Sequence, residues 1–110
     1  MGAVFKRGQT IQTWVKYQAV LSNGYIYFFL PQQQFYDSFV YIRNSEVINV
    51  DKETAGYANA IFIKNRYNEC YLAFDKEANL KKWTEAILSN RNQYNDLSLD
   101  DIGETTSSVK

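Results

Sequence analysis

The basic residues near the start of the chain are the side chains best suited to chemistry, and that chemistry is anion binding. Lys6, Arg7 and Lys16 are the only charged residues in positions 1–36, so this stretch carries three positive charges and no acid. Ammonium and guanidinium groups form strong, charge-assisted hydrogen bonds with phosphate oxygens. The pattern therefore favours an acidic ligand, such as the headgroup of an anionic phospholipid.

The residues that most catalytic sites require are missing from this sequence. The 110 residues include no histidine and a single cysteine, Cys70, which excludes histidine-based metal sites and Ser-His or Cys-His catalysis. No pair of carboxylates has catalytic or metal-binding spacing beside a nucleophile, and the five glycines are scattered instead of forming a phosphate-binding loop. Twelve basic and twelve acidic residues give no net charge, which disfavours nucleic-acid binding. We expect a non-catalytic protein without metal, cofactor or nucleic-acid partner.

The elements that must position the basic residues are predicted to be strands. Aromatic residues make up 16% of the chain, with nine Tyr and seven Phe, and they favour half-buried strands. Turn signals such as Asn23-Gly24 and Pro31 separate short apolar runs along the first 74 residues. The predicted strands are Val4–Arg7, Trp14–Leu21, Tyr25–Leu30, Phe39–Arg43, Val47–Val50, Ala60–Lys64 and Cys70–Phe74, with a long loop over 51–59.

Alternation along each predicted strand separates an inner from an outer face. The side chains expected to face the core are Val15, Tyr17, Ala19, Leu21, Ile26, Phe28, Leu30, Ile61, Ile63, Leu72 and Phe74. Lys16 then lies on the outer face of its strand. Tyr25, Tyr27 and Phe29 form an aromatic outer face on the next strand, and exposed aromatics are typical of interaction surfaces.

The period of the apolar residues changes after residue 74. Leu80, Trp83 and Ile87 recur on one helical face, and Asp75 is a suitable N-cap, so we predict a helix from Lys76 to about Asn90. This helix must bury its apolar stripe, and the end of the β-structure is the available surface. Residues 95–110 carry one lysine against four acids and several Ser and Thr, which predicts an acidic, disordered tail behind a domain at 1–94.

Several motifs in this order resemble the pleckstrin-homology family. The residues that carry the resemblance are Gly2-x-Val4-x-Lys6-Arg7-Gly8, Trp14-x-Lys16-x-x-x-Val20-Leu21, Asn23-Gly24-Tyr25-Ile26-Tyr27-Phe28, and Tyr71-Leu72-Ala73-Phe74-Asp75 followed by Trp83 and Ala86-Ile87. The resemblance covers about residues 2–90. It implies seven antiparallel strands in two orthogonal sheets, forming a barrel or sandwich closed by one C-terminal helix. Phosphotyrosine-binding and EVH1-type domains share this superfold and are alternatives.

The resemblance also implies a place for an acidic headgroup, at the end of the barrel between the first two strands. Family members that bind lipid place a Lys on the first strand and a basic pair on the second. This chain keeps Lys6, with Arg7 beside it, but Val15 and Tyr17 occupy the positions of the pair. The connecting loop offers uncharged donors such as Gln12. The predicted lipid-binding residues are Lys6, Arg7, Gln12, Lys16 and Tyr17, and Lys16 could serve an alternative anion site on the outer side of the loop.

The predicted lipid affinity is weak. A basic side chain near an anionic membrane contributes about 1 kcal/mol, so three contribute roughly 3 kcal/mol, whereas even a millimolar complex needs about 4 kcal/mol. We predict a cytoplasmic signalling or adaptor module that attaches peripherally to membranes by weak recognition of a phosphoinositide or phosphatidic acid. The alternative is a scaffold or protein- and peptide-interaction module without lipid binding.

Overall fold

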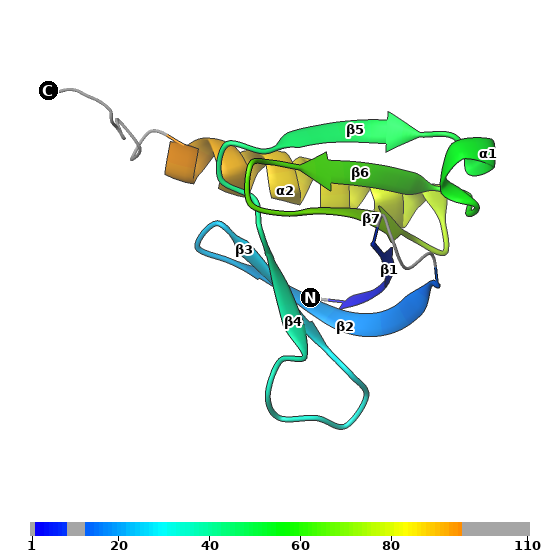
Figure 1. Ribbon diagram of the computed structural model, residues 1–110, viewed down its shortest axis with the longest axis horizontal. Coiled ribbons are helices and arrows are strands. Elements are labelled where there is room, and N and C mark those ends of the chain that lie inside the picture. Colours follow the sequence, from blue (N-terminus) through cyan, green and yellow to red (C-terminus); the bar gives the residue numbers. More distant parts are fainter. Residues whose placement is uncertain (1, 9–12, 96–110) are drawn as a thin grey trace, which may run out of the picture.

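The computed structural model describes residues 2–8 and 13–95, with only the backbone at 94 and 95. These residues form seven strands and two helices (Figure 1). The elements in chain order are β1 Gly2–Arg7, β2 Val15–Ser22, β3 Tyr25–Phe29, β4 Ser38–Tyr41, β5 Glu46–Val50, α1 Lys52–Ala55, β6 Ala60–Lys64, β7 Glu69–Ala73 and α2 Glu77–Asn95. Gln12 and the predicted tail from 96 onward lie outside the described residues.

The predicted strands are all present, and the helix follows them as expected. The ends of the strands shift by one or two residues, and α2 continues to Asn95 instead of ending near Asn90. The short helix α1 occupies the segment that was predicted to be a loop. It exists because Asp51 caps its start by accepting a hydrogen bond from the Thr54 N–H at 2.7 Å, and Gly56 ends it in the left-handed conformation with φ of 80°.

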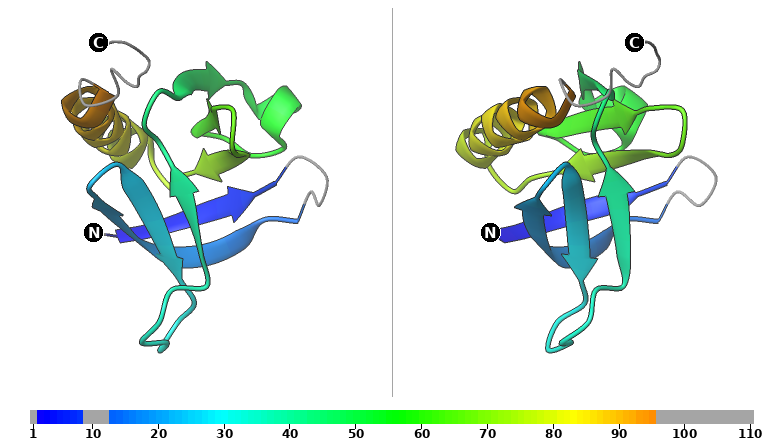
Figure 2. Two further views of the ribbon diagram at one scale, coloured as in Figure 1. Left: turned by 60° about the vertical axis from the view of Figure 1, so that its left-hand side comes forward. Right: turned by 90° about the vertical axis from the view of Figure 1, so that its left-hand side faces the viewer.

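The strands join into one antiparallel sheet in the order β4-β3-β2-β1-β7-β6-β5. β1 joins its two halves, because Gly2–Lys6 pair with β2 while Phe5–Arg7 also pair with β7. The predicted arrangement of two orthogonal sheets is therefore refined to a single, strongly bent sheet. Figures 1 and 2 show β5, β6 and β7 crossing over β1–β4, with α2 along one side.

The inner face of the bent sheet forms the main core, as the alternation predicted for most of its residues. Val15, which was expected to face this core, is 37% exposed because it lies beside Lys6 at the open end of β2, and Leu21 and Leu30 are half-buried. Its fully buried members include Val4, Ala19, Ile26, Phe28, Ile61, Ile63, Leu72 and Phe74. α2 contributes Trp83, whose ring stacks on Phe74 at 6.1 Å, and Ile87, which has no exposed surface. Burying a side chain of this size contributes about 1.5–3 kcal/mol, so these two residues hold α2 on the sheet. No helix in the described part of the chain is long and apolar enough to cross a membrane.

A second cluster lies on the outer face of the sheet, beneath α1. Its buried members are Ala55, Ala60, Tyr71 and Ala73, and the side chains packed against them are Phe5, Trp14, Val50, Tyr57 and Phe62. Tyr57 joins the cluster to β1 and to the residue before β2, with its ring 5.1 Å from Phe5 and 5.3 Å from Trp14. The outer side of β1 is therefore covered at its Phe5 end, next to Arg7.

Candidate functional site

Lys6 points to the inner side of the sheet, at the opposite end of β1 from Gly2, which lies against Trp83 of α2. The register pairs Lys6 with Val15 and Val4 with Tyr17, so these residues share the inward face. The Lys6 Nζ lies 3.5 Å from Ser38 Oγ, 5.1 Å from the Phe28 ring centre and 5.9 Å from that of Tyr17. We call this end of the sheet, defined by Lys6, Tyr17, Asp37 and Ser38, the mouth.

The mouth carries a carboxylate as well as an ammonium group. Tyr17 donates a hydrogen bond from its hydroxyl to Asp37 Oδ2 at 3.0 Å. Burial raises the pKa of Tyr17, and the hydrogen bond and the negative charge of Asp37 raise it further. Among the described residues, the side chains in contact with the Lys6 ammonium group are Ser38, Tyr17 and Phe28, and none of them is a cation. The mouth therefore lacks the converging positive donors that hold a polyphosphate tightly.

Arg7, predicted to bind lipid beside Lys6, lies on the opposite side of the sheet. Its side chain is only 7% exposed and enters the second cluster, with its guanidinium carbon 4.2 Å from the ring centre of Tyr71. Nε donates to the Ala55 carbonyl at 3.2 Å, and Nη1 donates to the Gly8 carbonyl at 2.9 Å. Adjacent residues of a strand face opposite sides, so Arg7 holds α1 against β1 and does not join Lys6.

Lys16 and Gln12 complete the set of predicted lipid-binding residues. Lys16 is exposed on the outer face, opposite Phe5 in the register, as the alternation predicted. Gln12 lies outside the described residues. Of the five predicted lipid-binding residues, Lys6 and Tyr17 come together at the mouth. Lys16 is next to Tyr17 in β2, but its side chain lies on the outer face of that strand.

The outer face of β3 and β4 carries a continuous row of rings, which we call the aromatic stripe. Its members are Tyr25, Tyr27, Phe29, Tyr36, Phe39, Tyr41 and Tyr67, with neighbouring ring centres 5.1–6.5 Å apart. Tyr36, Phe39 and Tyr67 are 51%, 49% and 71% exposed. The alternation found the β3 rings, whereas the contribution of Tyr67 depends on the β6–β7 turn folding against β4, which sequence spacing does not reveal.

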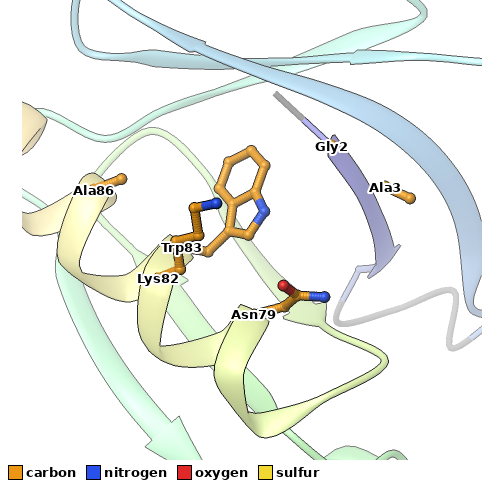
Figure 3. A pocket seen from close by; sticks show the side chains of 6 residues that line it. All are labelled: Gly2, Ala3, Asn79, Lys82, Trp83 and Ala86. Atoms are coloured by element: carbon orange, nitrogen blue, oxygen red, sulfur yellow. The ribbon is translucent and has the colours of Figure 1, made fainter.

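Two of the hollows formed by described residues lie outside the mouth. One, of about 540 Å³, is bounded by Asn68 and four rings of the stripe, those of Tyr25, Phe39, Tyr41 and Tyr67. The other, of about 160 Å³, lies between β1 and the start of α2, and Figure 3 shows Gly2 and Ala3 on one side of it and Asn79, Lys82, Trp83 and Ala86 on the other. The charged residue among those that line this smaller hollow is Lys82. Asn79 beside it donates a hydrogen bond to Asp75 Oδ1 at 2.6 Å.

Cys70 is buried and belongs to no metal-binding cluster in the described part of the chain. No group of three or more His, Cys, Asp or Glu side chains there could hold a metal ion. Burial raises the pKa of the Cys70 thiol to about 12, although the nearby charge of Lys6 acts in the opposite direction. A thiol that is buried and protonated at neutral pH is a poor nucleophile.

The chain is similar to PH domains both in sequence profile and in backbone fold. The sequence profile of the PH domain matches residues 1–91, and no curated protein matches the chain significantly. The pleckstrin homology domain of ArhGAP27 superposes with a TM-score of 0.70 at 19% identity, covering 81% of this chain and 96% of that one. The C-terminal PH domain of human pleckstrin gives 0.72 at 16% identity, covering 83% and 77%. The same pleckstrin domain in complex with D-myo-Ins(1,2,3,5,6)P5 gives 0.71 at 18% identity, covering 82% and 91%.

Proposed function

This chain belongs to the PH domain family, and from that premise we propose that it is a non-catalytic module that binds acidic phospholipid weakly and peripherally. The observation that carries the proposal is the Lys6 ammonium group at the mouth, whose polar partner in the described part of the chain is the neutral Ser38 hydroxyl. A structural relative, the C-terminal PH domain of pleckstrin, forms a complex with an inositol pentakisphosphate. The shared fold gives this chain a comparable end of the sheet, and Lys6 gives it one donor there.

The β3–β4 loop adds an apolar contact at the same end of the molecule. It projects from the body of the fold in both figures that show the whole chain (Figures 1 and 2). Phe35 in this loop is 80% exposed, and the loop leads directly into Asp37 and Ser38 of the mouth. Phe35 could therefore enter the headgroup region of a membrane while Lys6 and Lys16 approach the lipid phosphates.

The expected affinity follows from these three side chains. Lys6 and Lys16 contribute about 1 kcal/mol each near an anionic surface, and burying Phe35 contributes roughly 2 kcal/mol. Their total of about 4 kcal/mol corresponds to a Kd near 1 mM. Asp37 opposes this attraction at the mouth. Recruitment to a membrane then requires a second contact or several copies acting together.

Co-sedimentation with vesicles tests the proposal. Vesicles of phosphatidylcholine, alone or with phosphatidylserine, phosphatidic acid or a single phosphoinositide, are compared at low and physiological salt. We expect weak binding to all the anionic vesicles that falls with salt, and an approximately fivefold loss in each of Lys6→Gln and Lys16→Gln. Lys82→Gln on α2, a matched lysine away from the mouth, leaves binding unchanged. Anionic-vesicle binding that is equal in wild type and Lys6→Gln refutes the mouth as the site.

A second candidate function, protein recognition, is favoured by the aromatic stripe. Contiguous exposed apolar patches of several hundred Å² on a monomer are typical of interaction sites. At roughly 200 Å² per aromatic side chain, the exposed fractions of Tyr36, Phe39 and Tyr67 alone leave about 340 Å² open. This function needs no contribution from the mouth, so a domain that fails to bind vesicles could still perform it.

A further inference from the structure

The smaller hollow contains a hydrogen-bond donor that the described fold does not use. This hollow lies between β1 and the start of α2, and Trp83 forms one of its walls (Figure 3). The Trp83 side chain is only 7% exposed, yet no described residue accepts a hydrogen bond from its indole Nε1–H. A buried N–H normally has a partner, because leaving it without one costs free energy. The indole N–H is therefore available to an acceptor that enters the hollow.

Gly2 keeps the N–H edge of the indole ring open. A Cβ at this position would lie 3.7 Å from Trp83 Nε1 and 4.0 Å from Trp83 Cζ2. These are ordinary contact distances, so β1 could carry a side chain here without a clash. A residue larger than alanine would extend along the edge of the ring and occupy the space in front of the N–H. The glycine therefore leaves room for another group beside Trp83.

Lys82 supplies the positive charge of the hollow. It is the charged residue among those that line it, and its side chain is exposed. The acids at the start of α2 have other partners, since Asp75 accepts from Asn79 Nδ2 at 2.6 Å and Glu77 pairs with Lys81 at 3.9 Å. No acid in the described part of the chain forms an ion pair with Lys82. The hollow thus combines one ammonium group with one neutral N–H donor and has no carboxylate of its own.

The number and kind of these donors favour a carboxylate as the ligand. A carboxylate carries one negative charge and two acceptor oxygens, which match one ammonium group and one N–H. A phosphate group has a charge near −2 and three acceptor oxygens, so it needs more donors than this hollow offers. The hollow measures about 160 Å³, and a water molecule takes about 30 Å³, so roughly five water-sized groups fit. The end of an aspartate or glutamate side chain is of this size.

An acidic segment of the same chain is long enough to reach the hollow. Residues 96–110 follow α2 and carry one lysine against four acids, which are Asp96, Asp100, Asp101 and Glu104. Trp83 lies about 18 Å before the end of α2 at Asn95, at a rise of about 1.5 Å per residue. An extended chain advances about 3.3 Å per residue, so about six residues retrace this length. After a turn of about three residues, Glu104 comes level with Trp83, and Asp101 lies just short of it.

From these observations we propose that the hollow binds the carboxylate of an acidic side chain supplied by residues 96–110 of the same chain. One carboxylate oxygen accepts from the Trp83 Nε1–H, and the other pairs with the Lys82 ammonium group. This contact joins the segment after α2 to the start of β1. The hollow lies at the opposite end of β1 from Lys6, so the inference is independent of lipid binding at the mouth.

The indole ¹H–¹⁵N resonance of Trp83 in the full chain tests the inference. The acid-free variant replaces the four acids by amides, as Asp96→Asn, Asp100→Asn, Asp101→Asn and Glu104→Gln. We expect the Trp83 resonance to move upfield in this variant, because its hydrogen bond is lost. The resonance of Trp14, which packs in the second cluster, should stay in place. In a Lys82→Gln background the same four changes should no longer move Trp83, whereas in the matched Lys81→Gln background they should move it as in wild type.

A peptide titration separates the possible failures. The probe is the acetylated and amidated peptide of residues 100–104, Asp-Asp-Ile-Gly-Glu, added to the acid-free variant, with Asn-Asn-Ile-Gly-Gln as its control. The acidic peptide should return the Trp83 resonance toward its wild-type position, Lys82→Gln should weaken this binding up to about fivefold, and Gly2→Leu should abolish it. A response to the peptide without any effect of removing the four acids would overturn residues 96–110 as the occupant. If neither moves the Trp83 resonance, the carboxylate site itself is refuted, while vesicle binding at the mouth is tested separately.

Discussion

Replacing Arg7 by methionine should cost stability and leave membrane binding intact. The guanidinium group donates two hydrogen bonds, to the carbonyls of Ala55 and Gly8, and packs on the Tyr71 ring within the second cluster. Hydrogen bonds from a charged group contribute about 1.5–3 kcal/mol each, and a desolvated cation–π contact contributes about 2 kcal/mol. Methionine fills part of the space and recovers some packing. We therefore expect a net loss of about 3 kcal/mol, which lowers the Tm of a domain of this size by roughly 15 °C.

The matched control is the same substitution at the neighbouring residue. Lys6→Met removes a long hydrogen bond at the mouth and should cost less than about 1 kcal/mol, but it should reduce vesicle binding. Urea denaturation gives the free energy of unfolding of both variants, and co-sedimentation below the Tm of Arg7→Met gives their binding. A stability loss below 1 kcal/mol in Arg7→Met, together with loss of vesicle binding, would refute the assignment of Arg7 to the fold.

Three further predictions follow from individual residues. Gly56→Ala places a Cβ on a residue with φ of 80° and should lower the free energy of unfolding by about 1–2 kcal/mol in urea; an unchanged value would contradict the left-handed cap of α1. The raised pKa of Tyr17 means that its neutral form is favoured in the folded state, so its contribution to the free energy of unfolding is complete below the ordinary pKa of 10.0 and is lost as the pH rises above that value. Tyr17→Phe should remove this part of the loss of stability at alkaline pH in a pH series of unfolding curves. An identical pH profile in wild type and variant would count against this assignment. With a pKa of about 12 against 9.0 for a free thiol, Cys70 should react with iodoacetamide at least about a thousandfold more slowly than free cysteine at neutral pH, whereas labelling at the free-cysteine rate would show that the thiol is accessible.

Local pattern predicted the fold well because the strands obey simple alternation. Most of the predicted inward set is buried, since one face of each strand lies on a single core, whereas Val15 at the open end of β2 is exposed and Leu21 and Leu30 are half-buried. The helix α1 was missed because it has only four residues, and its capping residues, Asp51 and Gly56, look like loop residues in a short window. The continuity of the sheet through β1 depends on pairing between residues far apart in the sequence, which local pattern does not specify.

The lipid-binding site at the mouth was harder to predict because it depends on the face of the sheet on which each side chain lies. Lys6 and Arg7 look alike in the sequence as neighbouring cations, yet alternation sends them to opposite faces of β1. Applying that rule to β1 as well as to β2 would have separated them. The burial of Arg7 could not be foreseen in the same way, because it requires α1 and Tyr57 to cover the outer face. The larger hollow beside Asn68 likewise depends on the β6–β7 turn reaching β4, a contact made by the side chains of Asn65 and Asn68.

The most direct test of the central claim is a ¹⁵N-HSQC titration of the domain with nanodiscs that contain phosphatidic acid or a phosphoinositide, at low salt. The proposed function predicts the largest changes at Lys6, Lys16 and Phe35, with little change along α2, and their disappearance at high salt. Changes centred on α2 or on the residues around Arg7, or resonances that anionic nanodiscs leave unchanged at millimolar lipid, would contradict binding of acidic membranes at the mouth.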